Sequence, residues 1–325
     1  MDGRRRGSGR GTGSGLQANS SAPFPPARRW PTVGLVDHAE ARDVAFRCHR
    51  VLEPLHSFVY FAPEAEQELT ATGLRPGRMG YFASRAAPMG PVGAGVVAAT
   101  FYNFNPELVA RHIPRAWTLA SPGRILEARL AAADAGLRRV LGEELITSPR
   151  LAEAAELARS AASVLSPEGR PLYAGHAELE WPSEPHLVLW HAATLLREYR
   201  GDGHIAALVG HGLSGLAALI TYTATGKGFL EPVAKTTRGW SDEQWAAGVE
   251  QLREQGLLDA DGRLTSEGAV LRQSIEEQTN ASATAPWRHL GAEKAARLHE
   301  LARELSRHAV AHGAFPDGIF ATARA

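Results

Sequence analysis

The stretch from residue 213 to 266 limits the possible folds more than any other part of the chain, because its polar caps and glycines mark where helices begin and end. An apolar segment with helical character, 213–223, is followed after a glycine by a short segment, 229–237. Ser241 has two acidic residues directly behind it, as a helix N-cap usually does, and Gly256 has the position of a glycine that ends a helix. The pattern predicts a helix, a turn and a second helix.

A hairpin signal follows the second helix directly. The sequence Asp259-Ala260-Asp261-Gly262 is a turn of the Asp-Gly type between two leucine-containing segments, and another helix begins at Ser266. Helix, turn, helix, hairpin and helix in this order resemble the winged helix-turn-helix of MarR-type regulators over about residues 212–280. The resemblance implies that residues 241–256 would read DNA and that the hairpin, 257–265, would be the wing.

The charges on this segment argue against DNA as a partner. Residues 241–256 carry four acidic residues against one arginine, and the wing carries two aspartates against one arginine. DNA affinity rests mainly on the neutralisation of phosphates by basic side chains, so an acidic reading helix favours a winged helix that serves as a scaffold. If DNA is bound nevertheless, the candidate contacts are the basic residues Lys235, Arg238, Arg253 and Arg263.

A second resemblance extends over roughly residues 40–310. The segments that carry it are RVLEPLH at 50–56, RAAPMG at 85–90, FYNFNP at 101–106, and LWHAAT running into REYRGDGH at 189–204. Over this length the chain is similar to a family of actinobacterial proteins labelled SalK-like or simply helix-turn-helix. The resemblance implies no established activity.

Basic and acidic residues are unevenly distributed along the chain. Residues 1–30 hold six Arg against one Asp, which leaves 29 basic and 34 acidic residues for the remainder. Because this Gly-, Ser- and Arg-rich segment lacks the apolar residues of a core, we expect a disordered tail. The single Cys excludes a disulfide framework, and no run of about 18 apolar residues predicts a membrane span. We therefore expect a cytoplasmic protein without a membrane partner.

The remaining sequence predicts a mainly α-helical body in which the winged helix is embedded. Asn105-Pro106, Ser121-Pro122 and Ser148-Pro149 are typical helix starts. The Gly-, Pro- and Met-rich segment 74–91 predicts an ordered loop, and 96–104 fits either a strand or the end of a buried helix. A Pro- and Gly-rich stretch at 167–185 predicts a boundary between an N-terminal helical domain, 36–165, and a second domain, 186–315, that contains the winged helix.

Five of the 13 histidines lie between residues 176 and 211. Two apolar helices are predicted there, over 186–199 and 204–225, joined by a turn at Arg200-Gly201-Asp202-Gly203. Such a turn would bring both helix ends together, and side chains three and seven positions apart share one helix face. The candidate catalytic residues, as general acid or base groups, are His191, His204, Glu198 and Asp202. The same set has the chemistry of metal ligands, but we assign no metal ligand and leave the cofactor open.

A second group combines aromatic rings with a few polar tips, which is what an apolar ligand site needs and also what a core needs. The candidate ligand contacts in this group are His56, Tyr60, Arg85, Met89, Phe101, Tyr102, Phe104 and Arg197.

Three functions follow as alternatives. The first is a protein or enzyme that binds a small, largely apolar molecule between the N-terminal region and the helices of 186–211, with the winged helix as scaffold. The second is a ligand-responsive, MarR-like regulator that binds DNA. The third is a dimeric scaffold, since Leu298, Leu301 and Leu305 form a stripe fit for a partner helix. We expect a homodimer.

Overall fold

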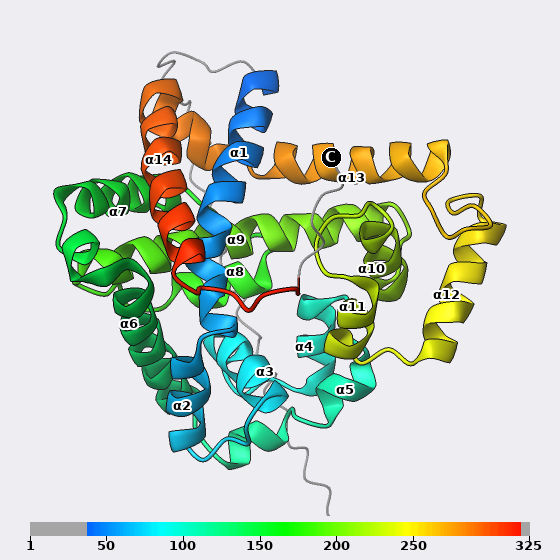
Figure 1. Cartoon of the computed structure of the whole chain (residues 1–325), viewed down its shortest axis with the longest axis horizontal. Helices are drawn as coiled ribbons and strands as arrows, with labels where there is room; N and C mark the ends of the chain where they lie inside the picture. The colour runs from blue at the N-terminus through cyan, green and yellow to red at the C-terminus, as the bar shows by residue number, and fades with distance from the viewer. Residues whose placement is uncertain (1–37, 320–325) are drawn as a thin grey trace, which may run out of the picture. The chain divides into compact units, whose positions relative to one another are not determined.

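The computed structural model describes residues 38–319, so the predicted tail, 1–30, lies outside the described residues. The described chain is mainly helical, as predicted (Figure 1). Its α-helices are α1 (His38–Ser57), α2 (Pro63–Ala71), α3 (Arg78–Ala86), α4 (Ala94–Phe101), α5 (Pro106–Ala110), α6 (Pro122–Ile146), α7 (Pro149–Ala162), α8 (Pro171–Ala177), α9 (Pro185–Gly210), α10 (Gly215–Thr223), α11 (Glu231–Arg238), α12 (Asp242–Glu254), α13 (Ser266–Ser282) and α14 (Ala285–Ala311). Three short 3₁₀ helices are η1 (Phe58–Tyr60), η2 (Ala87–Met89) and η3 (Arg115–Thr118).

Local capping explains many of the helix starts. The side chains of Asn105, Ser121 and Ser148 each accept a hydrogen bond from a backbone N–H in the first turn of the helix that follows, and a proline occupies the start of each helix. Ser241 forms a complete capping box with Gln244 at the start of α12. These predicted helix starts are confirmed.

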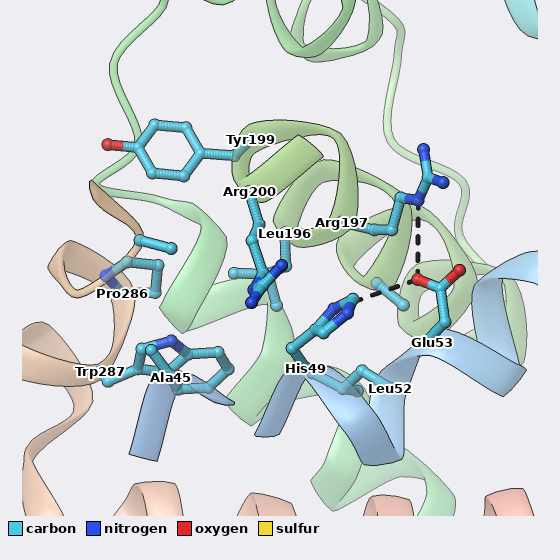
Figure 2. Close-up of a pocket in the computed structure, with 12 residues that line it drawn as sticks. Ala45, His49, Leu52, Glu53, Leu196, Arg197, Tyr199, Arg200, Pro286 and Trp287 are labelled. Carbon is cyan, nitrogen blue, oxygen red and sulfur yellow. Dashed lines mark ion pairs between the residues drawn. The ribbon is translucent and has the colours of Figure 1, made fainter. Parts of the chain in front are cut away.

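Helix α1 packs against both α9 and α14, and α7 also packs against both α9 and α14. Figure 2 shows the place where α1, α9 and the start of α14 meet, lined by residues such as His49, Arg197 and Trp287. The space left there is about 20 Å³. This is room for one water molecule and not for a ligand.

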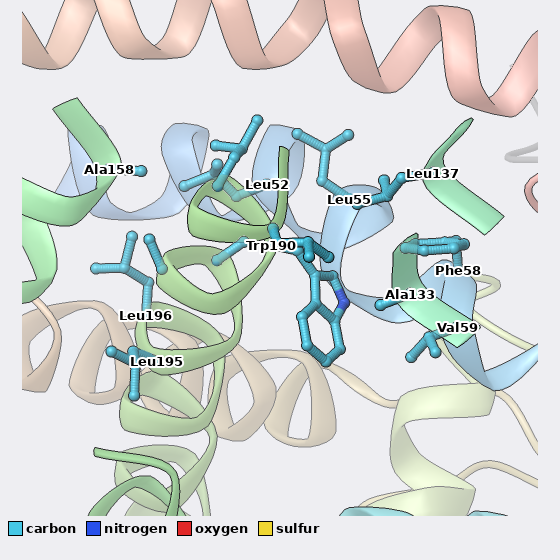
Figure 3. Packing of buried hydrophobic residues seen from close by; sticks show 14 of the residues in the cluster. Leu52, Leu55, Phe58, Val59, Ala133, Leu137, Ala158, Trp190, Leu195 and Leu196 are labelled. Atoms are coloured by element: carbon cyan, nitrogen blue, oxygen red, sulfur yellow. The ribbon is translucent and has the colours of Figure 1, made fainter. Parts of the chain in front are cut away.

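The larger hydrophobic core draws on residues 45–199 together with residues 287–314. Trp190 of α9 lies in this core with Leu55 of α1 and Leu137 of α6 (Figure 3). The predicted domain boundary at 167–185 stays a prediction. The leucine stripe of α14 is buried in the same core, with at most 3% of each side chain exposed for Leu298, Leu301 and Leu305. Its partner helices therefore belong to the same chain, which corrects the prediction that the stripe faces a second protein.

A second hydrophobic core holds α10, α11, α12 and the wing together, with Trp245, Leu252 and Ile275 among its buried residues. The wing is reduced to one antiparallel bridge between Leu258 and Leu264. Gly256 has the positive φ of a helix-ending glycine, 71°, as the sequence predicts. Helix α13 starts directly after the wing and ends close to the start of α14, so it links the two cores (Figure 1).

Two predicted connections are wrong. Residues 200–203 do not form a turn but continue α9 without a break. Gly203 is there for packing, because a Cβ atom at this position would come within 2.5 Å of Ser282 Oγ and 2.7 Å of Arg170 Nη1. The segment 74–91 is not a loop throughout, since α3 occupies its centre and is almost wholly buried. The open choice at 96–104 is resolved as a helix that ends at Phe101.

No single helix between residues 38 and 319 is long and apolar enough to cross a membrane. Helices α9 and α10 reach that length and composition only as a pair, across a bend of 102°.

Candidate functional site: a buried polar cluster behind a surface cleft

Glu198 lies in the middle of a cluster of polar side chains that the larger core encloses. It projects from α9 with 1% of its surface exposed. Arg85 of α3 donates two hydrogen bonds to it, from Nε to Oε1 at 3.1 Å and from Nη2 to Oε2 at 3.0 Å. Arg197 donates a third, from Nη1 to Oε2 at 2.8 Å. Burial raises the pKa of this carboxyl, but the charges of Arg197 and Arg85 outweigh burial and hold the pKa well below its usual range.

His56 of α1 forms the second part of the cluster and is fully buried. Its Nδ1 atom lies 2.9 Å from Thr194 Oγ1, and the Thr194 hydroxyl donates its own hydrogen to the Trp190 carbonyl at 2.8 Å. The threonine oxygen must therefore accept a hydrogen from His56 Nδ1. Burial, followed by the charge of Arg197, lowers the pKa of His56 well below its usual range, so the ring is neutral. Its Nε2 atom is left as an acceptor.

Tyr60 uses this acceptor. Its hydroxyl lies 3.1 Å from His56 Nε2, to which it donates, and accepts a hydrogen bond from Arg129 Nη2 at 3.4 Å. The Tyr60 ring meets the Tyr81 ring edge-on with 5.1 Å between the ring centres, and the Tyr81 hydroxyl accepts a hydrogen bond from Arg85 Nη1 at 3.4 Å. Tyr60 is thus hydrogen-bonded to Arg129 and Tyr81 to Arg85, and the two tyrosine rings contact each other.

A surface cleft of about 420 Å³ lies on the other side of these two rings. Residues of η1, α2 and α3 line it, including Tyr60, Tyr81, Ser84, Thr70 and Arg78. Tyr60 and Tyr81 are half-buried, whereas the charged groups behind them, Arg85 and Glu198, are buried. The two tyrosines are therefore shared by the cleft, which they line, and by the cluster, with which their hydroxyl groups form hydrogen bonds.

Three further side chains of the cluster carry polar atoms without a hydrogen-bond partner. Arg129 of α6 is 3% exposed, and its Nε has no acceptor among the described residues. Neither ring nitrogen of His176, on α8, has a partner there, and the same holds for Nε2 of His191 on α9. Burial lowers the pKa of both histidines, His191 to about 4, and for each the charge of Arg129 is the next cause.

The structure brings together several predicted site residues and separates others. His56 and Tyr60 belong to one hydrogen-bonded group, and Arg85, Arg197 and Glu198 belong to another. The two groups meet where the Tyr60 and Tyr81 rings touch, and Phe101 lies under the Arg85 guanidinium at 4.3 Å. His191 lies near them in the cluster, but its Nε2 atom has no hydrogen-bond partner among the described residues. Of the remaining predicted ligand contacts, Phe104 belongs to the larger core, Met89 packs against it, and Tyr102 packs against the second core.

His204 does not reach Glu198, because α9 continues where a turn was predicted, whereas Asp202 follows Glu198 by one turn of the same helix and lies close enough for the Glu198 charge to act on its carboxyl. His204 Nδ1 lies 2.8 Å from Thr279 Oγ1, on the side of α9 that faces α13. Asp202 Oδ2 accepts hydrogen bonds from the backbone N–H groups of Leu172 and Tyr173 at the start of α8, at 3.1 and 2.9 Å. The predicted convergence with Glu198 is therefore wrong for His204.

Sequence reasoning missed Tyr81, Arg129 and His176. A signal for Arg129 was present in α6, since Ile125, Ala132 and Ala133 are buried at helical spacing around it and place it on the buried face. His176 had no such signal, because α8 is only 7 residues long. Gly175 explains its position: a Cβ atom there would lie 2.8 Å from the Pro88 carbonyl oxygen, so only glycine lets α8 approach so closely.

The four basic residues predicted for DNA contact are held by neighbours within the chain. Lys235 Nζ lies 2.6 Å from Asp242 Oδ1, and Arg263 Nη1 lies 3.0 Å from Asp261 Oδ2. Arg253 donates to the backbone carbonyls of Asp259 and Ala260 at 3.1 and 2.7 Å. Arg238 turns inward onto the Phe104 ring, 4.5 Å from its centre, and burial lowers its pKa to about 10. Exposed Asp242, Glu243, Glu250 and Glu254 remain on α12.

Over residues 38–319, no three His, Cys, Asp or Glu side chains are grouped so that they could hold a metal ion.

Comparison with known proteins places the chain in a family. No curated protein and no solved structure matches it. A family model described as "Helix-turn-helix family" matches residues 45–316, which includes most of α1 and all of the helices from α2 to α14. Because this match covers more than half of the chain, the protein belongs to this helix-turn-helix family.

Proposed function

We propose that this helix-turn-helix protein binds a small molecule in the cleft between α2 and α3, and that its winged helix is a structural support. The observation that carries the proposal is the lining of the cleft, which includes Tyr60 and Tyr81, whose hydroxyl groups are hydrogen-bonded to buried arginines. A chain that needed only a stable core would gain nothing from these groups, because apolar side chains of similar volume are usually as stable as a buried ion pair. Buried, mutually perturbed ionisable groups beside a cleft are typical of functional sites.

The chemistry of the cleft suggests the kind of ligand. The ring faces of Tyr60 and Tyr81 offer apolar contact, and the Tyr60 hydroxyl exchanges hydrogen bonds with a neutral histidine on one side and a cation on the other. A ligand with an apolar body and one polar group would use both features. This narrows the sequence-based prediction of a largely apolar ligand.

A fragment screen on the untagged full-length protein tests the proposal. We expect small aromatic fragments to give saturation-transfer NMR signals that disappear in Thr70→Trp, since Thr70 is exposed and lines the cleft. Gln67→Trp is the matched control, because Gln67 is exposed on the same helix and outside the cleft lining. Equal signals from both variants would mean that the fragments bind elsewhere. An absence of signal in the wild type would contradict the proposal.

The family match makes a DNA-binding regulator the second candidate. Fluorescence anisotropy with a pool of random duplexes at low salt separates the two functions, since phosphate contacts make DNA affinity fall steeply with salt. We expect no saturable binding, because α12 exposes four acidic side chains and the nearby basic groups are already paired. Saturable binding that weakens with salt would favour the regulator. Native mass spectrometry of the same sample reports whether the predicted homodimer forms.

A further inference from the structure

We infer that Arg129, His176 and His191 form a recognition site for one carboxylate group, carried by the ligand of the proposed cleft. The inference rests on the proposed function and adds the chemical class of the ligand. The three side chains come from α6, α8 and α9, and at most 4% of any of them is exposed.

Arg129 differs from the other buried arginines of the larger core because it lacks a counter-charge among the described residues. Arg85 and Arg197 share the carboxylate of Glu198, and Arg200 lies 2.5 Å from Glu276. Arg129 has no such carboxylate within the part of the chain that the structure describes; its contacts are the Tyr60 hydroxyl and the ring of Trp190, 4.9 Å away. A buried guanidinium without a counter-ion is costly. An anion that enters from outside would remove that cost.

The protonation state of the two histidines sets the positive charge of the site, and therefore the charge of the anion that it can balance. Burial, and after it the charge of Arg129, keeps both rings neutral near pH 7. Each neutral ring has one N–H to donate, and Arg129 Nε is a further free donor. The site therefore offers several donors but a single positive charge, which one carboxylate balances and a phosphate dianion would exceed. The planar guanidinium also matches the two oxygens of a carboxylate.

The surroundings fit the apolar body of an organic acid. Trp190 lies against Arg129, and the Trp181 ring meets the His191 ring edge-on with 4.7 Å between centres. Tyr60 connects this group to the cleft, since it lines the cleft and accepts the Arg129 hydrogen bond.

Thermal unfolding with benzoate as the probe tests the inference. At constant ionic strength, benzoate should raise the unfolding temperature of the wild type saturably, whereas benzamide, its neutral analogue, and phosphate should have little effect. Arg129→Met should weaken benzoate binding at least tenfold. Arg124→Met, which removes an exposed arginine from the same helix, should leave benzoate binding unchanged. Because Arg129→Met removes an unpaired buried charge, its unfolding temperature without benzoate should not fall below that of the wild type.

Arg129→Lys is a second variant in case the methionine variant does not fold. It keeps the charge but loses the planar fork, so benzoate binding should again be weaker than in the wild type. Equal binding of benzoate and benzamide, or benzoate binding that survives in both Arg129 variants, overturns the inference while loss of binding in Thr70→Trp still supports the cleft. Phosphate that binds more tightly than benzoate overturns the assignment to a carboxylate. If neither fragments nor benzoate bind, both proposals fail.

Discussion

At the scale of single residues, the cluster contains two kinds of buried charge. Glu198 has its negative charge satisfied by two arginines, whereas Arg129 has no carboxylate partner among the described residues. The first arrangement stabilises the fold only while all three members are present, because a buried charge that loses its partner keeps its desolvation cost. The second costs stability without a ligand. Removing a charge should therefore have opposite effects at these two positions.

Glu198→Gln tests the first arrangement. The change leaves Arg85 and Arg197 beside a neutral amide, and we expect the free energy of unfolding to fall by about 3 kcal/mol. Urea denaturation followed by circular dichroism measures this. Glu153→Gln is the control, because Glu153 pairs with Arg297 at the surface, where such pairs contribute little. A loss at Glu198 no larger than that of the control would show that the arginines are solvated in solution.

At the scale of helices, close backbone approach positions the site. Gly175 allows α8 to pack against η2, and this contact places His176 inside the core. Asp202 fixes the start of the same helix by accepting two backbone hydrogen bonds. Helix α8 is thus fixed at its start by the Asp202 carboxylate and near its end by the close contact of Gly175 with η2.

Gly175→Ala should destabilise the protein even though alanine favours helices. Its Cβ atom would lie 2.8 Å from the Pro88 carbonyl oxygen, which is backbone and cannot move aside as a side chain could. We expect a loss of about 1–3 kcal/mol in the free energy of unfolding, the usual cost of overpacking. Gly123→Ala in α6 has free space around its Cβ and should be neutral or slightly stabilising. The same urea experiment compares the two, and equal stability of both variants would contradict this account of α8.

The helix scale also shows what the sequence can predict. The starts of α5, α6, α7 and α12 were predictable because a cap and its first turn are neighbours in the sequence. The turn at 200–203 was predicted wrongly because Gly203 packs closely against Ser282 and Arg170, which are distant in the sequence. For the same reason Glu198 could be predicted as a site residue and Arg129 could not. Glu198 shares a helix face with His191, whereas the surroundings of Arg129 come from residues of three other elements.

At the scale of the whole molecule, the winged helix has its own core and the polar cluster lies in the other. The connection between them is α9, which carries Glu198 in its first part and contributes Ala207 and Leu208 to the second core. Helix α13 adds a second link, since Arg200 of α9 donates to Asn280 of α13 at 2.8 Å. Through these two links the helix-turn-helix segment would support the proposed ligand site.

The number of buried neutral histidines predicts how the stability of the whole chain depends on pH. His56, His176 and His191 have folded-state pKa values below their usual range, the first two well below it and His191 at about 4, chiefly because of burial. In the unfolded chain each would take up a proton near pH 6.5. Unfolding therefore binds protons as the pH falls through 6.5, and the stability present above that pH is progressively lost.

From these three rings we expect the free energy of unfolding to be about 4 kcal/mol lower at pH 5.5 than at pH 7.5, since each contributes about 1.4 kcal/mol over this whole range, which is centred on the unfolded-state pKa. His49 and His204, whose pKa values burial also lowers, add to this loss. Urea denaturation at both pH values measures the difference. His176→Leu should reduce it by about 1.4 kcal/mol, because one proton-binding group is removed from the unfolded chain while the core position stays filled. A difference that is unchanged in this variant would show that His176 is protonated inside the fold, and the neutral cluster on which the carboxylate site depends would then carry a second positive charge.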